Sequence, residues 1–179
     1  MLYPEHIEQK LGFDQIRIML AEQCTANPGR EMVETMAFMS DPRGVNDALQ
    51  QTGEMMQILQ FHDSFPDLIY DDVRPSLKRT GINGTFLEAA EIIKIRRLLL
   101  TMASVQDFFR ANGSEKFPLL KVLLGDIRKM PAVIMRVDSI LDEKGEMKDT
   151  ASPDLSRIRK TMHQKQAQIA RAMQGILRK

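Results

Sequence analysis

Apolar residues recur along most of this chain at the spacing of a helix face. Near the start, Phe13, Ile16, Leu20 and Cys24 follow one another at intervals of three or four residues, which places them on one side of a helix. Similar spacing predicts further helices over 42–61, 85–111, 118–124 and 131–141, with a short helical turn over 75–80. The pattern therefore predicts an all-α protein, folded as a helical bundle.

For two of these helices the pattern also predicts the buried side. The inward residues expected in 42–61 are Val45, Leu49, Met56 and Leu59. Those expected in 85–111 are Ile92, Ile95, Leu99, Met102 and Val105. Extended structure is favoured in one stretch only, Leu141 to Thr150, where Lys144-Gly145 fits a tight turn.

Several segments open with a recognisable helix start. Asn27-Pro28, Asp41-Pro42 and Ser152-Pro153 each place a capping side chain before a proline. The cap accepts a free backbone N–H, and proline at the first helical position has no N–H to leave unpaired. Thr85-Phe86-Leu87-Glu88 has the spacing of a capping box. We therefore expect Thr85 and Glu88 to cap each other's N–H groups.

The last 25 residues, Leu155 to Lys179, read as a helix with a heptad repeat. The a and d positions are Leu155, Ile158, Met162, Lys165, Ile169, Ala172, Ile176 and Lys179, of which six are apolar. Such a seam packs against a partner helix. We expect this arm to be the first helix of a truncated coiled coil, and Asp149-Thr150-Ala151 to separate it from the body. The predicted domains are thus 1–150, the helical body, and 151–179, the protruding arm.

The arm also carries an unusual charge pattern. It has seven Lys or Arg residues and no acid, whereas the whole chain carries only +1, so residues 1–154 sum to about −6. A coiled-coil surface usually mixes both signs, because Glu–Lys pairs favour the helix. The pattern therefore favours polyanion binding over a solvated face. The candidate nucleic-acid-binding residues are Arg157, Lys160, Arg171, Arg178 and Lys179, with Lys165 a weaker candidate because it faces the seam.

Motifs for catalysis are missing from the sequence. No Gly-Lys dipeptide marks a P-loop, and no nucleophile stands with a base and an orienting group. His6, His62 and His163 are far apart and are expected at the surface, and Asp71-Asp72 is a poor metal site. We expect no cofactor or metal in this segment and no enzyme activity. The start lacks a signal peptide, and no apolar run could span a bilayer, so a cytoplasmic protein is expected.

Five segments, taken in order, carry a family likeness. They are Glu8–Ile16, Gly29–Glu31, Asp72–Arg79, Gly84–Glu88 and Asp149–Arg159. Together they resemble the second bacterial MutS paralogue, and the likeness runs through nearly all 179 residues. Phe86-Leu87-Glu88 also has the Phe-x-Glu spacing with which mismatch-recognition proteins wedge a ring into duplex DNA, but the capping role is the preferred interpretation.

The resemblance implies a much longer protein. Such proteins have a helical core and lever, a coiled-coil clamp, an ATPase that uses ATP and Mg, and often a C-terminal nuclease. The family implies a homodimer in DNA repair, mismatch repair or recombination control, acting on duplex or branched DNA, or on structured RNA such as ribosomal RNA. This segment would couple the absent ATPase to the clamp. An alternative is a protein-interaction or dimerisation module in which the charge of the arm is incidental.

Overall fold

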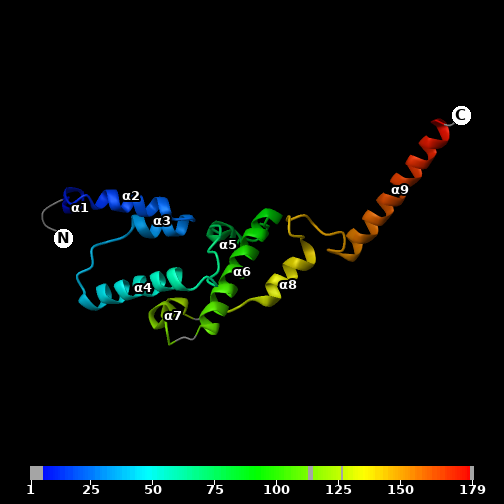
Figure 1. Cartoon of the computed structure of the whole chain (residues 1–179). Helices are drawn as coiled ribbons and strands as arrows, with labels where there is room; N and C mark the ends of the chain where they lie inside the picture. The colour runs from blue at the N-terminus through cyan, green and yellow to red at the C-terminus, as the bar shows by residue number, and fades with distance from the viewer. Residues whose placement is uncertain (1–5, 113–114, 126, 178–179) are drawn as a thin grey trace. The chain divides into compact units, whose positions relative to one another are not determined.

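The computed structural model describes residues 6–112, 115–125 and 127–177, with side chains described up to residue 174. The helices are α1 (Ile7–Lys10), α2 (Phe13–Gln23), α3 (Asn27–Glu34), α4 (Pro42–Phe61), α5 (Arg74–Thr80), α6 (Ala89–Ala111), α7 (Pro118–Leu124), α8 (Pro131–Ile140) and α9 (Pro153–Leu177) (Figure 1). The all-α prediction is confirmed, because the described residues form these helices and no strand.

The contacts divide the chain into two compact units. The first holds Met1–Phe86 and Lys94–Lys129, and the second holds Leu87–Ile93 and Met130–Lys179. Helix α6 therefore passes from the second unit into the first. This division differs from the body and arm expected from the sequence, and the boundary after residue 150 stays a prediction.

The core of the first unit is a cluster of three aromatic rings packed against one aliphatic side chain. Ile58 of α4 is fully buried, and Phe108, Phe109 and Phe117 are each less than a tenth exposed. The rings meet edge to face: the Phe108 and Phe109 centroids are 5.4 Å apart at 88°, an arrangement that aromatic pairs prefer. His62 joins them, with its ring centroid 5.5 Å from that of Phe117. His62 is half-buried, so the expectation of a surface residue holds only in part.

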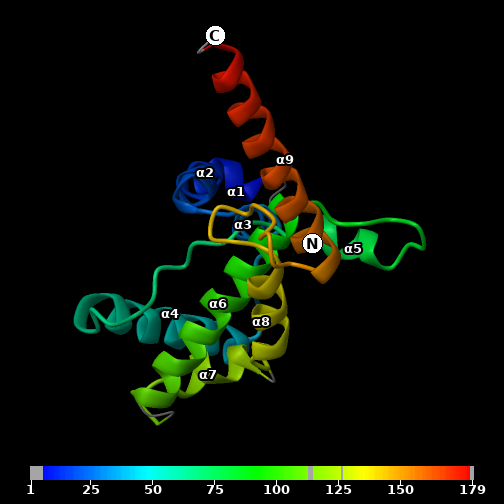
Figure 2. The ribbon, with the colours of Figure 1, turned by 90° about the vertical axis from the view of Figure 1, so that its right-hand side faces the viewer.

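Helix α7 lies beside α4 in both views of the ribbon (Figures 1 and 2). The Glu54 carboxylate of α4 accepts the backbone N–H groups of Leu119 at 3.2 Å and Leu120 at 2.9 Å. These N–H groups belong to the first turn of α7 and have no partner within that helix. Glu54 thereby fixes α7 to the side of α4 that carries Met55 and Ile58.

This docking explains why the predicted inward face of α4 is wrong for three of its four residues. Val45 is half-buried, but Leu49 is 67% exposed, Met56 54% and Leu59 67%. The helix has apolar residues on two faces, one through Ile58 and one through Leu59. Periodicity alone cannot choose between them, and the position of Glu54 decides in favour of the first. On α6, by contrast, all five predicted inward residues are half-buried, in agreement with the pattern.

Two of the predicted helix starts are confirmed. Asp41 accepts the N–H groups of Arg43 at 3.3 Å and Gly44 at 2.8 Å, and Ser152 Oγ accepts that of Leu155 at 3.1 Å. Asn27 is not a cap, because α3 already begins at this residue and Ala26 precedes it without a side-chain hydrogen bond.

The predicted capping box at Thr85 is wrong as well. The Thr85 hydroxyl donates back to the carbonyl of Ile82 at 2.8 Å, so it serves the preceding turn. Helix α6 begins four residues later, and the Glu91 carboxylate accepts the Glu88 N–H at 3.0 Å. One of the two hydrogen bonds of a capping box, from the N-cap N–H to the side chain three residues later, is therefore present between Glu88 and Glu91 in place of Thr85 and Glu88. Phe86 is left 80% exposed.

The stretch predicted to be extended forms a minimal hairpin in the second unit. Leu141 and Met147 make an isolated antiparallel bridge, and the turn between them contains Gly145 at φ 82°, a conformation that glycine adopts freely. Asp142 Oδ1 accepts the N–H groups of Lys144 at 2.9 Å and Glu146 at 2.8 Å. Asp142 thereby shapes this turn.

Two of the segments that carry the family likeness meet in the first unit. The Arg74 guanidinium donates to both carboxylate oxygens of Glu31, each at 2.8 Å, and also to Asp72 at 2.6 Å. Hydrogen bonds from Arg74 hold the pKa of Glu31 and that of Asp72 below their ordinary values. Asp71 faces Arg97 at 3.2 Å. Each member of the Asp71-Asp72 pair is thus matched by a guanidinium.

Candidate nucleic-acid interface

Helix α9 is started by three adjacent residues with separate effects. Ser152 caps a free N–H, Pro153 occupies the first helical position, and Asp154 lies in the first turn. A carboxylate in the first turn is favourable, because the N-terminus of a helix carries partial positive charge. These local signals explain why the arm begins where the sequence predicts, and the helix then continues to Leu177.

The described candidate cations share one face of α9. At about 100° per residue, Arg157, Lys160 and Arg171 fall within about 60° of one another around the helix axis. All three are exposed. Lys165 is also exposed but lies toward the apolar side, as expected. Arg178 and Lys179 lie outside the described residues. The binding role of all five candidates stays a prediction.

Two cations of the arm have acidic partners that the sequence interpretation overlooked. Arg157 contacts Asp154 at 3.0 Å and Arg159 contacts Asp149 at 2.7 Å. Both acids come just before Leu155, where the acid-free run begins. The helical spacing from Asp154 to Arg157 was a visible signal for the first pair, whereas the second depends on the path of the loop.

The remaining cations have no such partner in the described part of the chain. Lys160, Lys165 and Arg171 form no ion pair with described residues. The Arg157–Asp154 pair is itself exposed, with side chains 78% and 81% accessible, and an exposed pair contributes roughly 0.2–1 kcal/mol. Arg157 can therefore exchange Asp154 for a phosphate at small cost.

The opposite face of α9 is an exposed apolar row. Ile158 is 60% exposed, Met162 47%, Ile169 60% and Met173 59%. These residues lie about 160° around the axis from the cations, at about 100° per residue. An apolar row of this length is normally buried against another element. The seam expected from the heptads is therefore present, and its partner helix stays a prediction.

The hairpin loop and the first half of α9 enclose a shallow hollow within the second unit. It is lined by Asp149, Ser156, Arg159, Lys160, His163, Gln164 and Ala167. The Arg159–Asp149 pair ties the loop to the helix at this hollow. Lys160 lines it and also belongs to the cationic face. His163 is exposed here, as predicted.

Nowhere in 6–112, 115–125 or 127–177 do three His, Cys, Asp or Glu side chains gather as a metal site would require. None of the helices described combines the length and the apolar character needed to cross a membrane.

Comparison with known proteins supports the resemblance at a coarse level. No protein-family model matches the chain. A protein named endonuclease MutS2 from Lacticaseibacillus paracasei is 27% identical over 175 residues, which cover 97% of this chain and 22% of that protein. Proteins of the same name from Listeria innocua and a Geobacillus species are 29% and 28% identical, over 96% and 94% of this chain.

This chain spans about a fifth of the length of these curated relatives. The similarity therefore concerns one segment of a longer kind of protein and covers both compact units of this chain. The chain is similar, over nearly its whole length, to part of proteins named endonuclease MutS2.

Proposed function

We propose that this chain is the core and lever segment of a MutS2-like protein, and that α9 is the first helix of its clamp. On this proposal the helical body transmits movement, and the arm contacts duplex or branched nucleic acid. The name endonuclease belongs to the relatives. For the whole protein we propose an ATPase that uses ATP and Mg, with catalysis located outside this segment.

One observation carries the nucleic-acid part of the proposal. Helix α9 presents exposed cations opposite an exposed apolar row, and two of these cations, Lys160 and Arg171, have no acidic partner among the described residues. The apolar row suits a partner helix, and the cations then point away from that partner. Cations that neutralise phosphates release counterions, which gives affinity without sequence preference. The arm has no aromatic residue, so stacking on single-stranded bases is not expected.

The test compares binding to three labelled ligands at low salt. Fluorescence anisotropy would be measured with a DNA duplex, a four-way DNA junction and double-stranded RNA. The interface variant, Lys160→Gln with Arg171→Gln, should bind all three about threefold to tenfold more weakly than the unmodified chain, since each exposed charge contact contributes up to about 1 kcal/mol. A preference of the unmodified chain for the junction or for RNA would identify the structure it favours.

A matched control separates position from total charge. The control variant, Arg30→Gln with Lys78→Gln, removes one Arg and one Lys from exposed positions outside α9. It should bind as the unmodified chain does. Equal losses in both variants would reduce the effect to net charge and would remove α9 from the proposal.

The apolar row supports a second candidate function, a dimerisation or interaction module. On that view, Ile158→Ser with Ile169→Ser would abolish self-association measured by analytical ultracentrifugation, and the interface variant would associate normally and show no loss of nucleic-acid binding. For the proposed clamp, the interface variant should lose binding whatever its state of association.

A further inference from the structure

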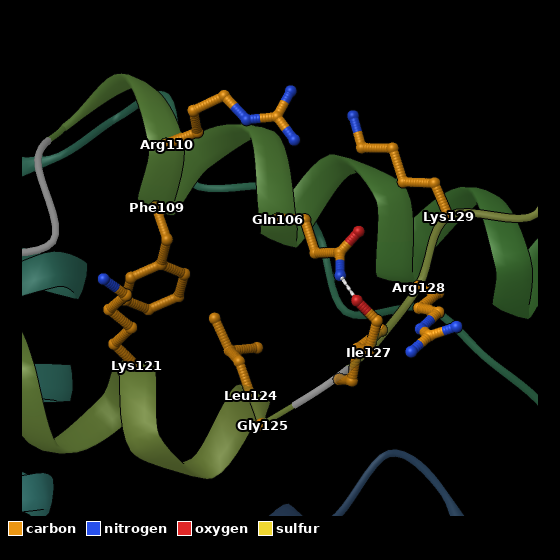
Figure 3. A pocket seen from close by; sticks show the side chains of 9 residues that line it. All are labelled: Gln106, Phe109, Arg110, Lys121, Leu124, Gly125, Ile127, Arg128 and Lys129. Carbon is orange, nitrogen blue, oxygen red and sulfur yellow. Dashed lines mark hydrogen bonds between the residues drawn. The ribbon is translucent and has the colours of Figure 1, made fainter.

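Four cations surround a hollow in the first unit, far along the sequence from α9. Arg110 comes from the end of α6, Lys121 from α7, and Arg128 and Lys129 from the segment that follows α7. Figure 3 shows Arg110 and Lys121 toward one end of the hollow and Arg128 and Lys129 toward the other. No pattern along the chain indicates this cluster, because its members come from three separate segments.

Local interactions hold these segments together. Gly125 ends α7 with φ 48°, which lets the chain turn back along α6. The Gln106 side chain of α6 then donates a hydrogen bond to the carbonyl oxygen of Ile127 (Figure 3). This bond fixes the two residues that follow, Arg128 and Lys129, beside the end of α6.

The charges around the hollow are not balanced among the described residues. Asp107 pairs with Lys129 and, at 3.6 Å, with Arg110. The Lys129 ammonium holds the pKa of Asp107 below its ordinary value, so this carboxylate remains ionised. Lys121 and Arg128 have no ion pair with described residues. Among the described residues, four cations thus face one carboxylate, that of Asp107. Asp126 is adjacent in sequence but lies outside the described residues, and this count does not include it.

The floor of the hollow is formed by apolar residues of α6 and α7. Phe109 is 7% exposed and belongs to the aromatic core, and Leu124 packs against that core. Within the seven described residues of α7, Lys121 is the only charged one, and it lines the hollow together with Phe109. The cations therefore stand around a hollow whose floor belongs to, or packs against, the aromatic core.

We propose that this hollow is a binding site for phosphate groups, held by Lys121 and Arg128 with Arg110 and Lys129 around them. Guanidinium groups match phosphate oxygens in a two-pronged geometry, and a lysine ammonium adds a point charge. The phosphate comes from a nucleic-acid backbone or from a free oligophosphate such as that of a nucleotide. The proposal does not depend on α9, because every residue of the hollow belongs to the first unit.

The experiment uses the whole 179-residue chain and two probes. The pocket variant is Lys121→Gln with Arg128→Gln, and its matched control is again Arg30→Gln with Lys78→Gln. A labelled DNA duplex is titrated by anisotropy across salt, and inorganic pyrophosphate is titrated by calorimetry at low salt. All the replaced residues are exposed, so thermal melts followed by circular dichroism should superimpose. A charge-preserving exchange, Lys121→Arg with Arg128→Lys, keeps the net charge but moves the guanidinium away from position 128, so it should bind more weakly than the unmodified chain and more tightly than the pocket variant.

Two results support the site and identify the source of the phosphate. If the backbone is the source, duplex affinity falls about threefold to tenfold in the pocket variant, and the log–log salt slope becomes shallower by about 1.8, at 0.9 for each lost phosphate contact. If a free oligophosphate is the source, pyrophosphate binds to the unmodified chain and is lost in the pocket variant, while duplex binding is unchanged.

The proposal is overturned if the pocket variant behaves like its control toward both probes. The interface variant of α9 keeps this outcome distinct from failure of the proposed function. A loss of duplex binding in the pocket variant alone would support the hollow and remove α9 from the proposed function. A loss in the interface variant alone, with no pyrophosphate binding to the unmodified chain, would support α9 and remove the hollow.

Discussion

The aromatic core of the first unit and helix α9 use similar residues in opposite ways. Ile58 is fully buried among phenylalanine rings, whereas Ile169 of α9 is 60% exposed. In the core, a second element completes the packing, because Glu54 fixes α7 against α4. In α9 the apolar row has no partner within the described residues. The comparison shows that an apolar pattern predicts a helix face, and that only a positioned partner turns this face into a core.

The largest effect is expected from the same substitution made in both places. Ile58→Ala removes buried methyl groups and leaves a cavity, so it should lower the free energy of unfolding by about 2–5 kcal/mol. Ile169→Ala should change it by no more than about 0.5 kcal/mol. Urea denaturation followed by circular dichroism measures both. Equal losses would mean that α9 is packed against a partner in solution.

A smaller effect is expected where α7 is fixed to α4. Glu54→Gln keeps the shape of the side chain but replaces one accepting oxygen by an NH2 group, so one of the two hydrogen bonds to the first turn of α7 is lost and the other is no longer charge-assisted, at a cost of about 1–2 kcal/mol. Glu22→Gln on the exposed surface of α2 removes the same charge and should be nearly neutral. Hydrogen exchange at Leu119 and Leu120 would show whether the loss is local. Unchanged exchange there would contradict the role given to Glu54.

The start of α9 should respond less strongly. Ser152→Ala removes the hydroxyl that accepts the Leu155 N–H, which should cost about 1 kcal/mol of helix stability. Because α9 gains little from packing, the effect should appear as fraying, seen as faster hydrogen exchange in residues 155–158. Thr85→Ala is the informative comparison, since its hydroxyl serves the turn before α6. Exchange at the start of α6 should not change in that variant.

The smallest effect concerns the exposed Glu31–Arg74–Asp72 cluster. Arg74 holds the pKa of Glu31 and of Asp72 below their ordinary values of 4.5 and 3.8. Lowered folded-state pKa values contribute stability that is present above the unfolded pKa and is lost as the pH falls through the folded pKa. Stability should therefore fall more steeply below pH 4.5 in the unmodified chain than in Arg74→Gln. Parallel pH profiles would remove the cluster from any role in stability.

Sequence reasoning succeeded where the signals were local. The bounds of α7 follow from Pro118 at its start and Gly125 at its end, and the start of α9 follows from Ser152-Pro153. It failed where a choice depended on distant residues. The sequence does not distinguish the two apolar faces of α4, because the choice depends on the hydrogen bond between Glu54 and α7. Thr85 does not cap α6, because its hydroxyl donates to the carbonyl of Ile82.

The same distinction holds for the candidate sites. The cationic face of α9 follows from spacing along one helix, and the exposure of Arg157, Lys160 and Arg171 agrees with it. The pairing of Arg159 with Asp149 required the path of the hairpin loop. The hollow around Lys121 and Arg128 required three segments brought together by Gly125 and the Gln106 hydrogen bond, which no periodic pattern in the sequence reveals.

The most direct test of the account is the salt dependence of duplex binding by the unmodified chain and by the interface variant, Lys160→Gln with Arg171→Gln. If α9 grips the backbone, the log–log slope should become shallower by about 1.8 in the variant, because each lost phosphate contact removes about 0.9. An unchanged slope and affinity in that variant would contradict the account and would leave α9 as a packing helix whose charge is incidental.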